Sequence, residues 1–257
     1  MYFIKHNLFT VPDISIPSQP FYKNYRIQDL PVSYLNLLDE QNGGYLAFNL
    51  VPTTEPTRDG LDSVGIHYLF GLHEDFGTSI LFQEHYHKAF SLPEYLIFFS
   101  VNDDQLWAFD YSNITNGEPS IRYIDMDTDQ WLTIADNFAT FLDLLQVAPP
   151  DINEEKVLSR LEANHSFLLG SDNDISQLLT RFETEPDKIW YFNWLEELLT
   201  HKNQDVQQAV FSAFETQVLY FNPVLPPTSL TIANSFKKLD SNLIDQERLA
   251  ILLKELQ

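Results

Sequence analysis

The chain has 257 residues, of which 44% are hydrophobic and 14% aromatic, enough for one large or two ordinary packed domains. It contains no cysteine, which excludes disulfides, thiol catalysis and cysteine-bound zinc. Fifteen basic and thirty-seven acidic side chains give a formal net charge of −22. Such a charge repels nucleic acid and anionic membranes, so we expect neither as a partner. It favours a basic protein partner, although an acidic surface that serves solubility alone stays open.

No secretory signal and no membrane-spanning stretch is visible in the sequence. No apolar run is long enough to cross a bilayer. The segment after Met1 lacks the cationic start and long apolar stretch of a secretory leader. Together with the lack of cysteine, these features predict a cytoplasmic protein.

The N-terminal part predicts a proline-bearing arm, a helix and two strands. Residues 1–26 form the arm, whose aromatic side chains we expect to pack on the domain. A helix is predicted over Leu30–Gln41, capped by Asp29 and ended by Gly43 in a left-handed conformation. Strands are predicted over Tyr45–Val51 and Gly65–Leu72, and residues 79–89 are compatible with a helix.

Four histidines fall within twenty-one residues and raise the possibility of a metal-dependent hydrolase: His67, His73, His85 and His87. Two histidines one residue apart on a strand point the same way and can share a metal, whereas on a helix they diverge. Scattered surface or half-buried histidines remain the favoured interpretation. The sequence has no Gly-x-Ser-x-Gly motif and no phosphate-binding glycine loop, and we predict no catalytic, cofactor or metal site.

The stretch 92–145 predicts a three-stranded meander closed by a helix. An apolar strand over Leu96–Val101 is followed by a turn, by the alternating residues 106–111, and by the strong turn pair Asn116-Gly117. The alternation resumes at residues 121–123. Thr133 and Asp136 then fit a capping box at the start of a helix that continues to Leu145.

Acidic residues concentrate in the predicted turn after Val101 and in the predicted loop between the last strand and the helix. Asp125, Asp127 and Asp129 alternate like the first ligands of a calcium loop, but Gln130 stands where such a loop needs glycine. Crowded carboxylates favour Lys or Arg side chains of a partner. The predicted partner-binding residues are Asp103, Asp104, Asp125, Asp127 and Asp129.

Pro149-Pro150 predicts a domain boundary, with an α+β domain over residues 1–147 and a small all-helical domain over residues 151–257. The helical patterns of the second domain begin near Val157, Ile175, Ile189, Val206, Ser229 and Asp245. The pair over residues 189–220 resembles one HEAT-like hairpin, but no second copy follows at a fixed period.

Two ordered blocks of residues carry a wider resemblance. The first contains Leu30-Pro31, Tyr34 and the turn Gln41-Asn42-Gly43-Gly44-Tyr45. The second contains Leu92-Pro93, Leu106-Trp107-Ala108-Phe109-Asp110-Tyr111-Ser112, Glu118-Pro119 and Ile134-Ala135-Asp136-Asn137-Phe138. Over residues 20–147 the chain thereby resembles the SUKH superfamily, which includes the yeast cell-wall-synthesis regulator and many bacterial immunity proteins. Members often have glycines in the turn where this chain has Asn102-Asp103-Asp104-Gln105.

The resemblance implies a SUKH-like sheet with packed helices and a protein without catalytic activity. It implies an immunity protein that neutralises a cognate bacterial toxin, and the acidic charge suits a nuclease-type toxin with a basic substrate groove. A regulatory or scaffold protein that binds a cellular partner is the alternative, and the histidine-based hydrolase is a second alternative.

Overall fold

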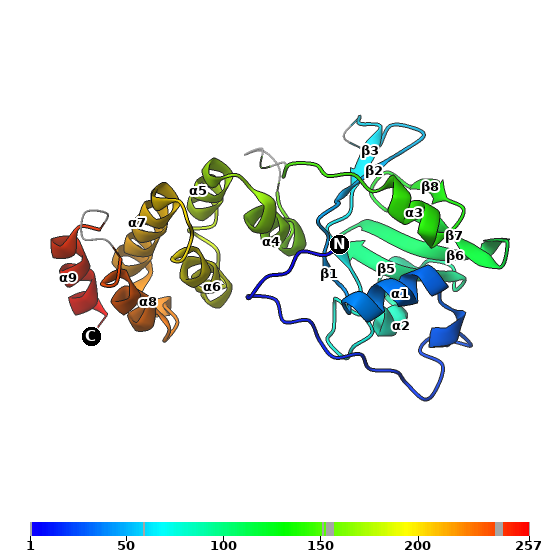
Figure 1. Ribbon diagram of the computed structural model, residues 1–257, viewed down its shortest axis with the longest axis horizontal. Helices are drawn as coiled ribbons and strands as arrows, with labels where there is room; N and C mark the ends of the chain where they lie inside the picture. Colours follow the sequence, from blue (N-terminus) through cyan, green and yellow to red (C-terminus); the bar gives the residue numbers. More distant parts are fainter. Residues whose placement is uncertain (1, 59, 151, 153–156, 240–243, 257) are drawn as a thin grey trace. The chain divides into compact units, whose positions relative to one another are not determined.

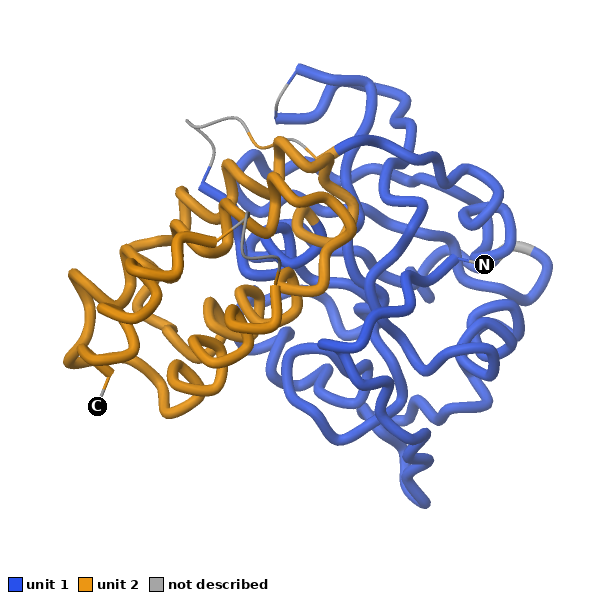
Figure 2. Tube along the Cα trace, turned by 60° about the vertical axis from the view of Figure 1, so that its left-hand side comes forward, with its two compact units in different colours: residues 1–149, 157–165 blue, residues 150–156, 166–257 orange. Residues whose placement is uncertain are grey.

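The computed structural model describes residues 2–58, 60–150, 152, 157–239 and 244–256. The chain divides into two compact units. The first unit contains residues 1–149 and 157–165, and the second contains residues 150–156 and 166–257 (Figure 2). The division into domains of residues 1–147 and 151–257 stays a prediction.

The first unit has the predicted α+β architecture, with sheets and helices in one hydrophobic core (Figure 1). Its helical elements are η1 (Ile27–Asp29), α1 (Val32–Glu40), η2 (Ile80–Phe82), α2 (Gln83–Phe90), α3 (Phe138–Leu144) and the start of α4 (Arg160–Leu169). Its strands are β1 (Gly44–Tyr45), β2 (Leu50–Pro52), β3 (Ser63–Gly65), β4 (Tyr68–Leu69), β5 (Leu96–Asn102), β6 (Gln105–Thr115), β7 (Glu118–Asp125) and β8 (Gln130–Ala135).

The main sheet is an antiparallel meander in the order β5-β6-β7-β8, one strand more than predicted. Thr133 lies inside β8, where it is paired with Arg122, so the predicted capping box does not form. Residues 130–135 alternate, with Leu132 buried and Trp131 partly exposed, and this pattern suits a strand beside β7. The helix begins after Asn137, whose side chain accepts a hydrogen bond from Thr140 N.

The two strands predicted upstream of the meander are each interrupted. β1 pairs with β4, and β2 pairs with β3, so two short sheets replace one continuous ladder. Between β1 and β2 the backbone turns to other partners, because Ala47 N donates to Tyr2 O and Asn49 N donates to Gln146 O. The alternating pattern of the sequence does not predict these long-range hydrogen bonds.

The first helix is shorter than predicted and has no side-chain cap. Asp29 belongs to η1, and Pro31 occupies the N-cap position of α1. Gly43 has the predicted positive φ of 79°, but the helix ends two residues earlier, at Gln41. A Cβ at Gly43 would lie 2.6 Å from Gly71 N, so close backbone approach explains this glycine.

One face of the meander is closed by aromatic rings of α1 and α3. Trp107 and Phe109 share this face. Phe109 contacts Tyr34 of α1 and Phe138 of α3, with ring centroids 5.2 and 5.6 Å apart. Trp107 contacts Phe141 of α3 at 5.5 Å. The ends of the strands, with their turns, therefore project from a rigid, fully buried core.

The second unit is helical. It contains α5 (Asp172–Arg181), α6 (Lys188–Leu198), α7 (Gln204–Phe221), η3 (Asn222–Val224), α8 (Ser229–Phe236) and α9 (Gln246–Glu255). α6 and α7 form the predicted hairpin, and Phe214 of α7 contacts both Phe192 and Phe236. The likeness of this hairpin to HEAT repeats stays a prediction. In the part of the chain that the structure describes, no helix has the length and apolarity needed to span a membrane.

Candidate protein-interaction site

The acidic turns of the meander lie at one end of the sheet. Gln105, at the start of β6, pairs with Asp125, at the end of β7, and Asp125 pairs in turn with Gln130 of β8. The β5–β6 turn and the β7–β8 turn are therefore neighbours. Asp103 adopts a φ of 52°, so an aspartate takes the left-handed conformation in the β5–β6 turn.

Arg58 joins these two turns to the loop between β2 and β3. Its Nε lies 2.6 Å from Asp125 Oδ2 and its Nη2 lies 2.7 Å from Asp125 Oδ1, a bidentate pair. Nη2 also lies 2.9 Å from Asp104 Oδ1, and Nη1 lies 3.5 Å from Asp127 Oδ2. The same loop is held a second time, because Gln130 Nε2 donates to Pro56 O.

Asp125 is the buried centre of this cluster. Its side chain has no exposed surface and also accepts hydrogen bonds from the backbone N–H groups of Asp127 and Thr128. Burial raises the pKa of Asp125, but the hydrogen bonds from Arg58 and Thr128 outweigh burial and hold the pKa below its ordinary value. Asp125 therefore stays ionised and stabilises the folded structure.

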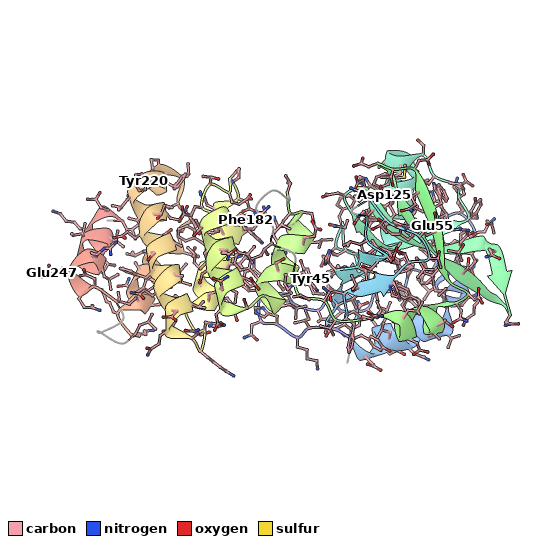
Figure 3. The ribbon with its side chains drawn as sticks, turned by 90° about the horizontal axis from the view of Figure 1, so that it is seen from above. Tyr45, Glu55, Asp125, Phe182, Tyr220 and Glu247 are labelled. Atoms are coloured by element: carbon pink, nitrogen blue, oxygen red, sulfur yellow. The ribbon has the colours of Figure 1, made fainter. Side chains whose placement is uncertain are left out.

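The five predicted partner-binding residues differ in solvent exposure. Asp103, Asp127 and Asp129 are exposed, and Asp104 is half-buried beside Arg58. Asp125, labelled in Figure 3, is buried. A hydrogen bond with Asp104 raises the pKa of Asp127, a sign of how closely the carboxylates crowd. We call the three exposed residues, Asp103, Asp127 and Asp129, the acidic rim.

Sequence reasoning missed Arg58, although a signal existed. It is the one Lys or Arg in the sequence between Arg26 and Lys88, in a chain with many carboxylates. A lone cation in a polar loop is a candidate for a buried ion pair. Its carboxylate partner, 67 positions away, could not be read from spacing.

The four clustered histidines do not converge. His87, on α2, lies with Nδ1 3.1 Å from Leu92 O and Nε2 2.9 Å from Leu96 O. His85 contacts Phe76, and His73 is buried near Asp75. Among the described residues, no group of three or more His, Cys, Asp or Glu side chains is arranged to hold a metal ion.

His67 belongs instead to a second polar cluster, which the sequence did not predict. Its ring lies 4.9 Å from that of His165, and its Nε2 lies 3.6 Å from Glu162 Oε1. His165 Nε2 is 2.8 Å from Leu46 O, and Asn164 Nδ2 donates to the hydroxyl of Tyr45. Tyr45 is labelled in Figure 3. Residues 157–165 thereby belong to the first unit, although they follow the predicted boundary.

The comparison with family models gave one match, which lies within the first unit. Residues 25–144 match the model of the SMI1/KNR4 family (SUKH-1). The matched segment runs from just before η1 to the end of α3 and includes the whole meander. The resemblance of residues 20–147 to the SUKH superfamily is therefore confirmed over the residues that the family model matches. Searches of curated proteins and of solved structures gave no match.

Proposed function

We propose that this protein is an immunity protein whose SUKH-like domain binds and neutralises a basic, nuclease-type bacterial toxin without catalysing a reaction. The observation that supports it best is the acidic rim, three exposed carboxylates on adjacent turns of the segment that matches the SUKH-1 family model. A nuclease must hold phosphates in a basic groove, and an acidic surface can occupy that groove.

The cluster beneath the rim suits a binding surface. Arg58 is bound to Asp104 and Asp125, which fixes both turns before a partner arrives. Preorganised groups lose less conformational entropy on binding than mobile ones. The net charge of −22 adds a long-range field that accelerates the approach of a basic protein.

Salt dependence of the association rate tests this mechanism. The probe is the product of the gene next to this one, purified as a catalytically inactive variant. We expect the association rate to fall about tenfold or more between 20 and 300 mM NaCl, because salt screens the attraction of opposite charges. A rate that does not change with salt would exclude electrostatic blocking.

Removal of the rim charges locates the surface. The double variant Asp127→Asn/Asp129→Asn should slow association about threefold to tenfold at low salt and leave folding intact, because both side chains are exposed. The control Glu247→Gln/Glu255→Gln removes the same two charges from exposed positions of α9. Equal slowing in both variants would show that only the net charge matters.

A regulatory protein that binds a cellular partner is the second candidate, and the same surface supports it. Affinity capture separates the two. If the adjacent gene product does not bind and a housekeeping protein is retained in its place, the immunity function is wrong.

A further inference from the structure

A hollow of about 510 Å³ opens at the other end of the β6–β7 hairpin, away from the acidic rim. One wall comes from Asn24, Tyr25 and residues 28–32, around η1, and the other comes from Tyr111 and residues 117–119 of the hairpin. Tyr111 lies six residues along β6 from Gln105, roughly 20 Å at about 3.3 Å per residue. The hollow and the acidic rim are therefore separate surfaces.

The two walls are held in place by the chain itself. The Tyr111 hydroxyl donates to Asp29 O at 2.6 Å, which ties η1 to the sheet. The hairpin turn is closed by Asn116 and Gly117, with φ of 54° and 87°, and Thr115 pairs with Glu118 across it. The hollow is thus a feature of rigid elements.

The chemistry of the lining residues selects a cation. The rings of Tyr25 and Tyr111 lie 4.8 Å apart at 50°, and the carboxylate residues Asp29 and Glu118 stand beside them. The described residues that line the hollow include no Lys, Arg or His. Aromatic faces attract cations, and carboxylates supply the opposite charge.

Arginine matches this combination better than lysine. Its guanidinium is flat, stacks on aromatic rings and donates two parallel hydrogen bonds to a carboxylate. Asp29 Oδ2 accepts a hydrogen bond from Arg26 N, so the N-terminal cap of η1 occupies one of its two oxygens. We propose that this hollow binds an arginine side chain presented by a protein partner, at a site distinct from the acidic rim.

A titration of the isotopically labelled full chain with N-acetyl-arginine N′-methylamide tests the site. We expect saturable amide shifts confined to residues 24–32, 111 and 117–119, with a dissociation constant on the order of 1 mM, typical of a small fragment. The citrulline analogue has nearly the same shape without the charge, and it should bind about tenfold more weakly.

Matched variants connect the shifts to the lining residues. Glu118→Gln and Asp29→Asn should each weaken binding about threefold to tenfold, and the asparagine introduced by the second variant can still cap η1. Tyr25→Leu removes one ring and should weaken binding similarly. Asp127→Asn changes a residue of the acidic rim and should leave the arginine titration unchanged.

Three results would overturn the proposal: no shifts at 20 mM ligand, equal binding of arginine and citrulline analogues, or binding unchanged in Glu118→Gln and Asp29→Asn together. None of them bears on the acidic rim. Conversely, loss of toxin binding in Asp127→Asn/Asp129→Asn leaves the arginine titration as it was.

Discussion

Two polar clusters tie distant segments of the first unit together, and they handle charge in opposite ways. In the cluster around Arg58, a carboxylate with no exposed surface meets a bidentate guanidinium and stays ionised. In the cluster around His165, a ring with 1% of its surface exposed meets a carbonyl oxygen and a second histidine. Burial, and then the nearby His67, lowers the pKa of His165 to about 4. A buried group therefore keeps its charge only where an opposite charge lies against it.

The clusters also differ in what they hold. Arg58 fixes a loop onto two hairpin turns and so shapes the acidic rim. Asn164 and His165 fix the start of α4 onto β1 and the residue after it. The first cluster should therefore fail when a charge is removed, and the second when a charge is added.

The substitution Arg58→Met removes the buried ion pair of the first cluster and should have the largest effect on stability. It leaves Asp125 buried without its counter-ion, which should lower the free energy of unfolding of the first unit by about 3–5 kcal/mol. Hydrogen exchange of the buried amides in β6 and β7 measures this change. Lys88→Met, which breaks the exposed pair with Glu84, serves as the control and should leave exchange unaltered.

A second variant distinguishes lost pairing from lost packing. Arg58→Met/Asp125→Asn removes the stranded charge as well and should recover part of the loss, since no buried ion remains. If the stability losses of Arg58→Met and Asp125→Asn simply add in the double variant, Arg58 and Asp125 are not coupled through their ion pair.

Acid should weaken the second cluster before the first. His165 has a folded pKa of about 4 against 6.5 in the unfolded chain, so the unfolded state binds more protons in between. Its contribution is fully present above pH 6.5 and is lost as the pH falls toward 4, up to about 3 kcal/mol in all. Asp125, whose pKa is lowered, keeps its contribution above its ordinary value of 3.8 and loses it below.

His165→Gln tests the origin of this pH dependence. Glutamine can still donate to Leu46 O but cannot take up a proton. The groups that face His165 are His67, Glu162 and Tyr45, and all three remain in the variant. We expect the exchange-derived stability of the amides of residues 45–47 to become nearly flat between pH 7.5 and 5. An unchanged slope would assign the effect to another group.

The sequence predicted features that depend on neighbouring residues and missed features that depend on distant ones. Local patterns were sufficient for the turn at Asn116-Gly117 and for the existence of the helix α5. The cap of α5 was not predicted as it stands, since Ser171 forms a capping box with Asp174. The turn and the capping box both depend on residues within a few positions of one another. Thr133 and Asp136 present nearly the same local pattern, yet pairing with Arg122 on β7 makes Thr133 a strand residue. The pairing of this segment with β7 made it a strand, and such pairing cannot be read from neighbouring residues in the sequence.

The candidate site was predictable only in part. The acidic segments were visible because Asp103 stands in a predicted turn of the meander and because Asp127 and Asp129 follow its predicted last strand. That the second segment is also a hairpin turn was not predicted, because β8 was missed. The sequence could not show that Asp125 is buried, because its partner lies 67 residues away. The contact of Asn164 with Tyr45 spans 119 residues and crosses the predicted boundary. Residues this far apart are brought together by the fold, and their contact does not appear in the periodicity of the sequence.

Tyr45→Phe gives the smallest expected effect and tests how the second cluster holds α4. The variant keeps the ring, which lies edge-on to Tyr68 at 5.0 Å, and removes the hydroxyl that accepts from Asn164. Loss of one neutral hydrogen bond in a buried site should cost about 1 kcal/mol, far less than loss of the Arg58 charge. Exchange should accelerate at residues 160–165 and 45–46 and stay constant in β7, where Asp125 is anchored by Arg58. Acceleration in β7 of the same size would mean that the two clusters open together and that the first unit responds as one cooperative block.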